Sequence, residues 1–347
     1  MIAASYVLPI RREAVEDAAE GLWTYVRRLS DQVGEVIVVD GSPPEVFEAH
    51  AAALRGSSIR HVPVDSKLAT PMGKVGGVLT GLWLAGQERV VIADDDVRYT
   101  PDALTRVVTL LDRFHVVRPQ NYFDPLPWHA RYDTARMLLN RLSGGDWPGT
   151  VGVRRSVLRD TGGYDGGAMF ENLELVRTVR AVGGTEAIPL DLFVARRPPR
   201  ARHFFSQRVR QAYDELARPL RFGLFLALIP LGVTLAVRGH WATLVVAVGA
   251  SVVLAEAGRR RGGGTAVFPA TASLLAPAWL VERAACTWLA LGARLFLGGI
   301  PYRTSVLRLA ANSAKELRRR HRAAYGTAAL AGREAPLVAR RVYGDNT

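Results

Sequence analysis

Cysteine is almost absent from this sequence, because Cys286 is the only one among 347 residues. A single cysteine excludes an intrachain disulfide and a zinc site built from several thiolates, and it fits a reducing compartment. The sequence also lacks the basic region that precedes the apolar stretch of a signal peptide, and its first short apolar run is followed directly by Arg11 and Arg12. We therefore expect residues 1–10 to form a strand rather than a signal peptide.

Acidic residues are the minority among the charged ones, with 32 Asp and Glu against 45 Lys and Arg and a formal net charge of +13. Such an excess of basic residues could bind nucleic acid. Much of it, however, lies beside an apolar block between Phe222 and Ile300, where anionic lipid headgroups attract basic side chains. We therefore expect a membrane, and no nucleic acid, as the partner of the basic surface.

The apolar block is nearly free of charge, since Arg294 is the only charged residue inside its four apolar segments. These segments are Phe222–Val237, Trp241–Ala255, Thr265–Val281 and Ala284–Ile300. Each approaches the length that crosses a bilayer, about 17 to 25 residues, so three or four spans are expected. Four spans would put a turn at Glu282–Cys286. Basic residues flank the first two segments on one side, which places the preceding domain in the cytoplasm.

The first 216 residues alternate short apolar runs with stretches of helical spacing. Strands are expected at Ser5–Ile10, Glu35–Val39, Ile59–Val64, Arg89–Ala93, Val116–Val117 and Thr150–Val153, and helices at Glu13–Leu29, Gly73–Ala85, Arg131–Leu142 and Asn172–Val182. This alternation predicts an α/β domain with a mostly parallel sheet. The predicted organisation is a catalytic domain over 1–216, membrane or interfacial helices over 217–302 and a basic cytoplasmic tail over 303–347.

Three consecutive carboxylates, Asp94, Asp95 and Asp96, follow the strand expected at Arg89–Ala93. The carboxyl edge of a parallel sheet is where α/β proteins bind ligands. Asp94 and Asp96 can approach one hard cation, because alternate side chains lie on one face and such cations prefer oxygen ligands. A solvated acidic turn would show the same pattern, so other motifs must decide between them.

Several further segments occur in the order typical of one family. They are Tyr6-Val7-Leu8-Pro9, Val38-Val39-Asp40-Gly41-Ser42, Lys74 with Gly76 and Gly77, Ala93-Asp94-Asp95-Asp96, Gly162-Gly163-Tyr164-Asp165 and Gln207-Arg208-Val209-Arg210-Gln211. Together they resemble family 2 glycosyltransferases, whose nucleotide-binding domain has the GT-A fold. The acidic triplet is similar to the DxD motif of that family, and the last segment is similar to its QxxRW element. The resemblance covers most of the chain from Ser5 to about Arg308.

The resemblance implies a metal-dependent glycosyltransferase of the hexosyl-transferring class. Mg²⁺ or Mn²⁺ on Asp94 and Asp96 would stabilise the nucleoside diphosphate that leaves. Arg210 would add a cationic clamp. The other residues expected at the nucleotide-sugar donor are Pro9, Asp40, Asp65, Lys74, Asp95, Gln207 and Arg208. Among these, Asp65 could equally be an ordinary turn residue, and Lys74 a solvated surface lysine.

The sequence departs from the family at the general base, where a Glu-Asp pair is common and this chain has Glu171-Asn172. Asparagine cannot take a proton, so the role passes to Glu171, Glu174 or Asp165. Glu171 and Glu174 share a helical face. Glu171 could instead serve only to complement the positive end of a helix.

Three functions therefore compete. The first is an inverting transfer of sugar from a nucleotide sugar to a lipid or hydrophobic acceptor at the cytoplasmic membrane face. The second is processive polysaccharide synthesis, which the Gln207–Arg210 element favours and Gln211, in place of the family tryptophan, disfavours. The third, motivated by Asn172, is a membrane scaffold that keeps the fold and has weakened catalysis.

Overall fold

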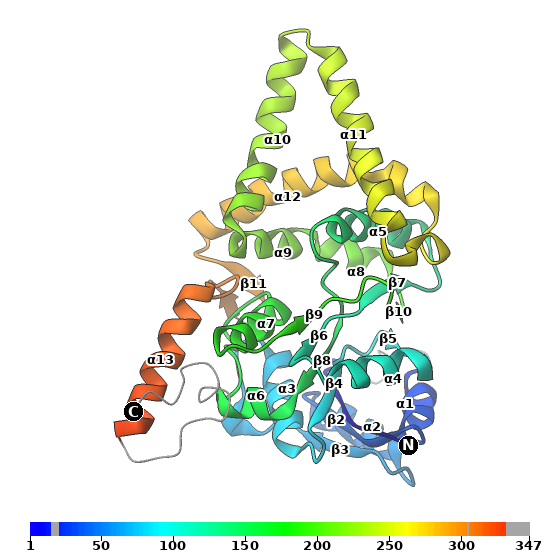
Figure 1. Ribbon diagram of the computed structural model, residues 1–347, viewed down its shortest axis with the longest axis vertical. Coiled ribbons are helices and arrows are strands. Elements are labelled where there is room, and N and C mark those ends of the chain that lie inside the picture. Colours follow the sequence, from blue (N-terminus) through cyan, green and yellow to red (C-terminus); the bar gives the residue numbers. More distant parts are fainter. Residues whose placement is uncertain (15–20, 304, 331–347) are drawn as a thin grey trace. The chain divides into compact units, whose positions relative to one another are not determined.

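The computed structural model describes residues 1–14, 21–303 and 305–330, with side chains up to 322 (Figure 1). Residues 15–20 of the helix predicted at 13–29, and the end of the predicted tail from 331, lie outside the described residues. The chain forms two compact units. Unit 1 contains residues 1–119, 148–187 and those from 312 onward, and unit 2 contains residues 120–147 and 188–311. The domain limits predicted at 216 and 302 stay predictions.

Unit 1 is built on a seven-stranded sheet of order β3-β2-β1-β4-β8-β6-β9. The strands are β1 (Ile2–Ile10), β2 (Val33–Asp40), β3 (Arg60–Pro63), β4 (Arg89–Ala93), β6 (Val116–Val117), β8 (Thr150–Arg154) and β9 (Glu186–Ala187). Neighbouring strands are parallel except at β8, which runs antiparallel to β4 and β6. The predicted α/β class with a mostly parallel sheet is confirmed.

The register of this sheet brings the ends of its central strands to one edge. Ile10, the last residue of β1, pairs with Asp40, the last residue of β2. On the other side of β1, Val7 pairs with Ile92, so Asp94 follows β4 at the same edge. The two acidic motifs predicted at strand ends therefore belong to one edge of the sheet, where parallel sheets bind ligands.

Helices pack on the sheet of unit 1 and on one another (Figure 1). They are α1 (Leu22–Ser30), α2 (Pro44–Leu54), the 3₁₀ turn η2 (Ser66–Leu68), α3 (Gly73–Leu84), α4 (Pro101–Leu110), α6 (Arg155–Asp160), α7 (Glu171–Ala181) and α13 (Ala314–Leu330). The helices predicted near 73–85 and 172–182 are confirmed within two residues. Helix α2 was missed, although Pro44 in its first turn is a signal for a helix start.

Helix α3 lies close against β1 because two glycines face the strand. A Cβ atom added at Gly81 would lie 2.3 Å from Val7 Cγ1, and one added at Gly77 would lie 2.9 Å from Pro9 Cβ. Both distances are too short for any side chain, so the close approach requires glycine at these positions. This packing fixes the first turn of α3, which carries Lys74, at the carboxyl edge of the sheet.

Unit 2 joins a short parallel pair of strands to a set of helices. The strands are β7 (Gln120–Phe123) and β10 (Phe193–Arg196), and a hairpin of β11 (Ile300–Tyr302) and β12 (Ser305–Leu307) follows the last helix. The helices are α5 (Trp128–Leu142), α8 (Ala201–Ser206), α9 (Arg208–Tyr213), η3 (Asp214–Ala217), α10 (Pro219–Val237), α11 (Trp241–Arg260), η4 (Arg261–Ala266), η5 (Ala270–Leu275) and α12 (Ala276–Phe296). Trp279 of α12 packs with Phe225 of α10 in the core of this unit.

Three helical segments of unit 2 are long and apolar enough to cross a membrane, namely Pro219–Val237, Trp241–Ala266 and Ala270–Phe296. Only 6% and 17% of the apolar windows of the first two are buried inside the protein, against 39% of the third. Figure 1 shows α10 and α11 as the arms of a hairpin, with α12 crossing at its base. Helices α10 and α11 therefore present their apolar surface outward, as lipid-facing helices do.

The four-span version of the prediction is wrong, because no turn occurs at Glu282–Cys286. Helix α12 continues through these residues from Ala276 to Phe296. Glu282 is compatible with a continuous helix because Arg208 binds its carboxylate, with Arg208 Nε 2.8 Å from Glu282 Oε1. The carboxylate of Glu282 is thus paired inside the protein.

Candidate active site

The acidic triplet forms a turn between β4 and the short strand β5 (Val97–Arg98). The Asp94 amide donates to Gly149 O at 2.8 Å, and the Val97 amide donates to Asp94 O at 3.1 Å. Asp95 forms an ion pair with Arg12. Asp94 and Asp96 are both partly exposed at this turn. Their carboxylate oxygens suit Mg²⁺ or Mn²⁺, so these two residues could hold such an ion.

Lys74 places a cation against Asp94. Its Nζ lies 2.5 Å from Asp94 Oδ1 and 2.6 Å from Glu171 Oε1. Burial alone would lower the pKa of Lys74, but the two ion pairs outweigh it and raise this pKa above its usual range. Lys74 is therefore a charged member of the site rather than a solvated surface lysine. The ammonium also shows that a cation fits beside Asp94.

The two glutamates proposed as base have different surroundings. Glu171 is the first residue of α7, keeps 15% of its side chain exposed and pairs with Lys74. Glu174 is fully buried, and both of its oxygens accept hydrogen bonds from Asn312: the side chain donates at 2.8 Å and the backbone amide at 2.7 Å. Burial raises the pKa of Glu174 despite these hydrogen bonds. The structure thus brings Glu171, and not Glu174, to the acidic turn.

Asp165 and Asn172 also have observed partners. Asp165 Oδ2 accepts hydrogen bonds from Asn312 Nδ2 at 2.9 Å and from Arg320 Nη1 at 3.2 Å. Asn172 Nδ2 donates to Pro148 O at 3.1 Å. Asn312 was missed by the sequence reasoning. Its position could be inferred from the sequence only through the neighbouring Ser313 and Glu316, which have the spacing of a helix cap. In the structure Ser313 Oγ accepts a hydrogen bond from the Glu316 amide at the start of α13.

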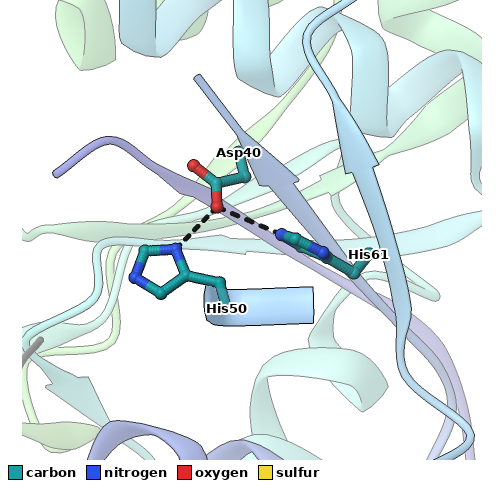
Figure 2. Close-up of side chains that lie close together, drawn as sticks. All are labelled: Asp40, His50 and His61. Atoms are coloured by element: carbon teal, nitrogen blue, oxygen red, sulfur yellow. Dashed lines mark hydrogen bonds and ion pairs between the residues drawn. The ribbon is translucent and has the colours of Figure 1, made fainter. Parts of the chain in front are cut away.

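Asp40 lies at the end of β2 in a buried cluster with two histidines (Figure 2). Asp40 Oδ2 accepts hydrogen bonds from His50 Nδ1 at 2.7 Å and from His61 Nε2 at 3.1 Å, and Oδ1 accepts from the Ser42 amide at 2.9 Å. Burial alone would raise the pKa of Asp40, but the hydrogen bonds from His61, Ser42 and His50 hold it well below its usual range. The sequence reasoning missed both histidines.

The same cluster is a second place where described residues could hold a metal. One ligand atom from each of Asp40, His50 and His61 lies within 4.8 Å of the other two. Two imidazoles and a carboxylate form a donor set that suits Zn²⁺. In the structure the hydrogen bonds from both imidazoles already satisfy Asp40 Oδ2.

The Asp40 cluster predicts a pH-dependent contribution to stability. Asp40→Asn should lower the free energy of unfolding by about 1–3 kcal/mol at pH 7, since it removes a buried charged acceptor. A carboxyl group with a depressed folded pKa stabilises the protein above its unfolded pKa, about 3.9, and this stabilisation is lost as the pH falls toward the folded pKa. The difference between wild type and Asp40→Asn should therefore shrink below about pH 4.

Denaturation by urea in detergent, followed by tryptophan fluorescence, measures this difference, because Trp23 contacts His50 at 5.0 Å between ring centroids. The exposed residue Asp31 supplies the control variant Asp31→Asn, which should leave stability nearly unchanged. An undiminished loss in Asp40→Asn at pH 3 would contradict the assignment of the stabilisation to the charged carboxylate.

The residues expected to bind the donor from the Gln207–Arg210 element belong to unit 2. Arg208 is buried and donates to Asp133 Oδ1 at 2.8 Å as well as to Glu282. Arg210 lies over the Tyr302 ring, 5.3 Å from its centroid, and Gln207 Nε2 donates to Ser206 Oγ at 3.1 Å. Arg208 thus serves an internal ion-pair network. The role of Arg210 stays a prediction.

Two further predicted donor residues lie in unit 1. Pro9 is in β1, opposite Val39 of β2 and in contact with α3. Asp65 is exposed, and its Oδ1 accepts from the Lys67 amide at 2.9 Å, which caps the short turn η2. This contact is the turn role that the sequence left open for Asp65, and its role at the donor stays a prediction.

No protein-family model and no curated protein sequence matches the chain. Solved structures do. A mannosyltransferase from Pyrobaculum calidifontis in complex with GDP-Man and Mn²⁺ is 19% identical over 82% of this chain and 87% of its own, with a TM-score of 0.48. Mannosyl-3-phosphoglycerate synthase from Rubrobacter xylanophilus is 19% identical over 63% of this chain and 74% of its own, with a TM-score of 0.43.

A third similar structure is glucosyl-3-phosphoglycerate synthase from Mycobacterium tuberculosis in complex with Mg²⁺ and UDP. It is 22% identical over 58% of this chain and 73% of its own, with a TM-score of 0.40. All three identities are below 25% and all three TM-scores are below 0.5, so nothing about activity is concluded from these similarities.

Proposed function

We propose that this protein is a metal-dependent glycosyltransferase that moves a sugar, with inversion, from a nucleotide-sugar donor to a lipid or hydrophobic acceptor. The observation that carries the proposal is the arrangement of Asp94, Lys74 and Glu171. A carboxylate suited to a hard cation, an ammonium and a second carboxylate meet at the carboxyl edge of a parallel sheet. The first two groups can bind a diphosphate, directly or through a metal ion, and the second carboxylate can accept a proton.

Each group has a role in the transfer. Asp94 and Asp96 would hold Mg²⁺ or Mn²⁺, which supplies positive charge as the nucleoside diphosphate leaves. Lys74 would bind the diphosphate oxygens. Glu171 takes the proton from the acceptor hydroxyl, because Glu174 is buried against Asn312 and Asn172 is neither acidic nor basic. Asp40 and Pro9 lie at the same sheet edge, where the nucleoside would bind.

The apolar helices of unit 2 support a hydrophobic acceptor. Helices α10 and α11 expose large apolar side chains such as Leu220, Leu224, Val245 and Val246, which suit hydrocarbon and not water. A membrane-bound enzyme meets hydrophobic acceptors in the plane of the bilayer. The flanking arginines favour the cytoplasmic side for the catalytic residues.

Gln211 favours single transfer over processive synthesis. Its Oε1 accepts a hydrogen bond from Arg208 at 2.9 Å. The family tryptophan at this position would stack on a sugar of a growing chain, whereas Gln211 is held by an internal contact. The length of the product distinguishes the two activities.

The proposal is tested with purified full-length protein in detergent. Radiolabelled nucleotide sugars, with and without lipid extract, should yield sugar transfer or slow donor hydrolysis that requires Mg²⁺ or Mn²⁺. Turnover would exclude the scaffold alternative. Absence of turnover with every uridine, guanosine and cytidine diphosphate sugar would reject the proposed enzymatic function.

Topology can be tested at the turn between α10 and α11. Native Cys286 does not report on it, because this thiol is buried and donates to Glu282. We expect the exposed residue Arg238, changed to cysteine in a Cys286→Ala background, to react with an impermeant maleimide from outside the cell. The matched control is Lys67→Cys in the same background, because Lys67 is exposed in unit 1 and should react only in inverted vesicles. Labelling of Arg238→Cys only in inverted vesicles would reject the crossing of α10 and α11.

A further inference from the structure

Lys74 lies between the residue proposed to hold the metal and the residue proposed to act as base. Its Nζ is 2.5 Å from Asp94 Oδ1 and 2.6 Å from Glu171 Oε1. The side chains of Lys74, Asp94 and Glu171 keep 22%, 25% and 15% of their surface exposed. One ammonium therefore bridges both carboxylates and leaves the three groups with a net negative charge, and solvent ions can still reach all of them.

This contact has a consequence for metal binding. An oxygen that accepts a hydrogen bond from an ammonium at 2.5 Å cannot also ligate a divalent ion from the same side. A metal ion at Asp94 would, in addition, lie within a few Å of the ammonium, where like charges repel strongly in a partly buried site. Metal binding through Asp94 Oδ1 therefore requires the Lys74 ammonium to leave this oxygen, and repulsion between the two cations favours its move to another anion.

The donor brings such an anion. Lys74 is in the first turn of α3, a helix of 12 residues, and backbone N–H groups at a helix start favour phosphate. The lysine stem is flexible and its ammonium is a compact point charge, so a small rotation can exchange one anionic partner for another. The diphosphate of the proposed donor would bind the ammonium as the metal takes its place on Asp94.

We propose that Lys74 is an internal counter-ion that couples metal binding to donor binding. It holds Asp94 and Glu171 together in the donor-free protein and transfers to the donor diphosphate when metal and donor enter together. This inference rests on the proposed function. Two results follow from it: the metal binds weakly alone and tightly with a nucleoside diphosphate, and Glu171 loses its ammonium partner only in the complex with donor. The base is thus free to accept a proton only when there is a sugar to transfer.

The test is the affinity of the purified full-length protein for Mn²⁺, measured by electron paramagnetic resonance without nucleotide and with UDP or GDP. Wild type should bind Mn²⁺ much more tightly with the matching nucleoside diphosphate. Lys74→Met should bind Mn²⁺ without nucleotide at least about tenfold more tightly than wild type, because a like charge has been removed, and should gain less from nucleotide. Lys67→Met removes the same charge from an exposed position and should behave as wild type.

Two outcomes overturn the inference. One is an unchanged or weaker affinity of Lys74→Met for Mn²⁺ without nucleotide. The other is a Lys74→Arg variant that binds Mn²⁺ as tightly as Lys74→Met, since arginine keeps the charge and should keep the weak binding. Failure of the proposed function gives a different result, namely no turnover of any nucleotide sugar by wild type. The inference about Lys74 fails when wild type transfers sugar and Lys74→Met leaves the affinity for Mn²⁺ unchanged.

Discussion

Replacing Asp94 by Asn is expected to reduce sugar transfer by about 10²- to 10³-fold or more, the loss that follows removal of one preorganised electrostatic contact in an active site. Asn keeps the size of the side chain but removes the charge that a divalent ion requires. The change should also weaken Mn²⁺ binding in the presence of a nucleoside diphosphate. Both effects are measured on the same preparation, by transfer assay and by electron paramagnetic resonance.

Asp102 supplies the matched control for Asp94. It is an exposed carboxylate in the first turn of α4, a few residues beyond the acidic turn. Asp102→Asn should therefore leave both transfer and Mn²⁺ binding close to wild type. Full activity of Asp94→Asn in the presence of a chelator would show that the acidic turn holds no catalytic metal, and the mechanism would have to be replaced.

Glu171→Gln is the second change with a large expected effect. It should lower kcat by about 10²- to 10⁴-fold, the usual contribution of a general base. Donor affinity should not fall, because the proton is transferred only in the transition state and the change removes a carboxylate that competes with the donor for Lys74. Steady-state kinetics and equilibrium binding of the nucleoside diphosphate separate the two quantities.

Glu174→Gln is the matched control for Glu171, since it changes the same residue type one helical turn further along α7. Glu174 is buried and accepts two hydrogen bonds from Asn312, so this change should lower thermal stability and leave kcat within a few-fold of wild type. The opposite pattern, with kcat lost in Glu174→Gln and kept in Glu171→Gln, would move the base to Glu174.

The order of the elements and the acidic turn could be predicted because their signals are local. The apolar run Arg89–Ala93 ends in Asp94 along the chain itself, and the structure has β4 over those five residues. Side-chain partners depend on residues that are far away in sequence. Lys74 reaches Glu171 across 97 positions, and its place depends on how closely the glycines of α3 approach β1.

The choice of the catalytic base shows why distant partners could not be predicted from the sequence. Glu171 and Glu174 share a helical face, so the sequence could not separate them. Asn312, 138 positions beyond Glu174, separates them by occupying both oxygens of Glu174. The turn predicted at Glu282–Cys286 failed for a related reason, because the partner of Glu282 is Arg208, 74 positions earlier. The histidines around Asp40 come from α2 and β3, and only the register of β2 with β3 places His61 beside it.

The position of Asn312 late in the sequence determines when unit 1 can finish folding during synthesis. It belongs to the last stretch of unit 1, and the ribosome makes that stretch only after helices α10, α11 and α12. A nascent chain whose apolar helices have just been synthesised still carries Glu174 without the partner that satisfies both carboxylate oxygens. The unit that contains Asp94, Lys74 and Glu171 is therefore finished only after the apolar hairpin has left the ribosome. A chain cut short before residue 312 would keep its three apolar helices and lack the closing contact on α7.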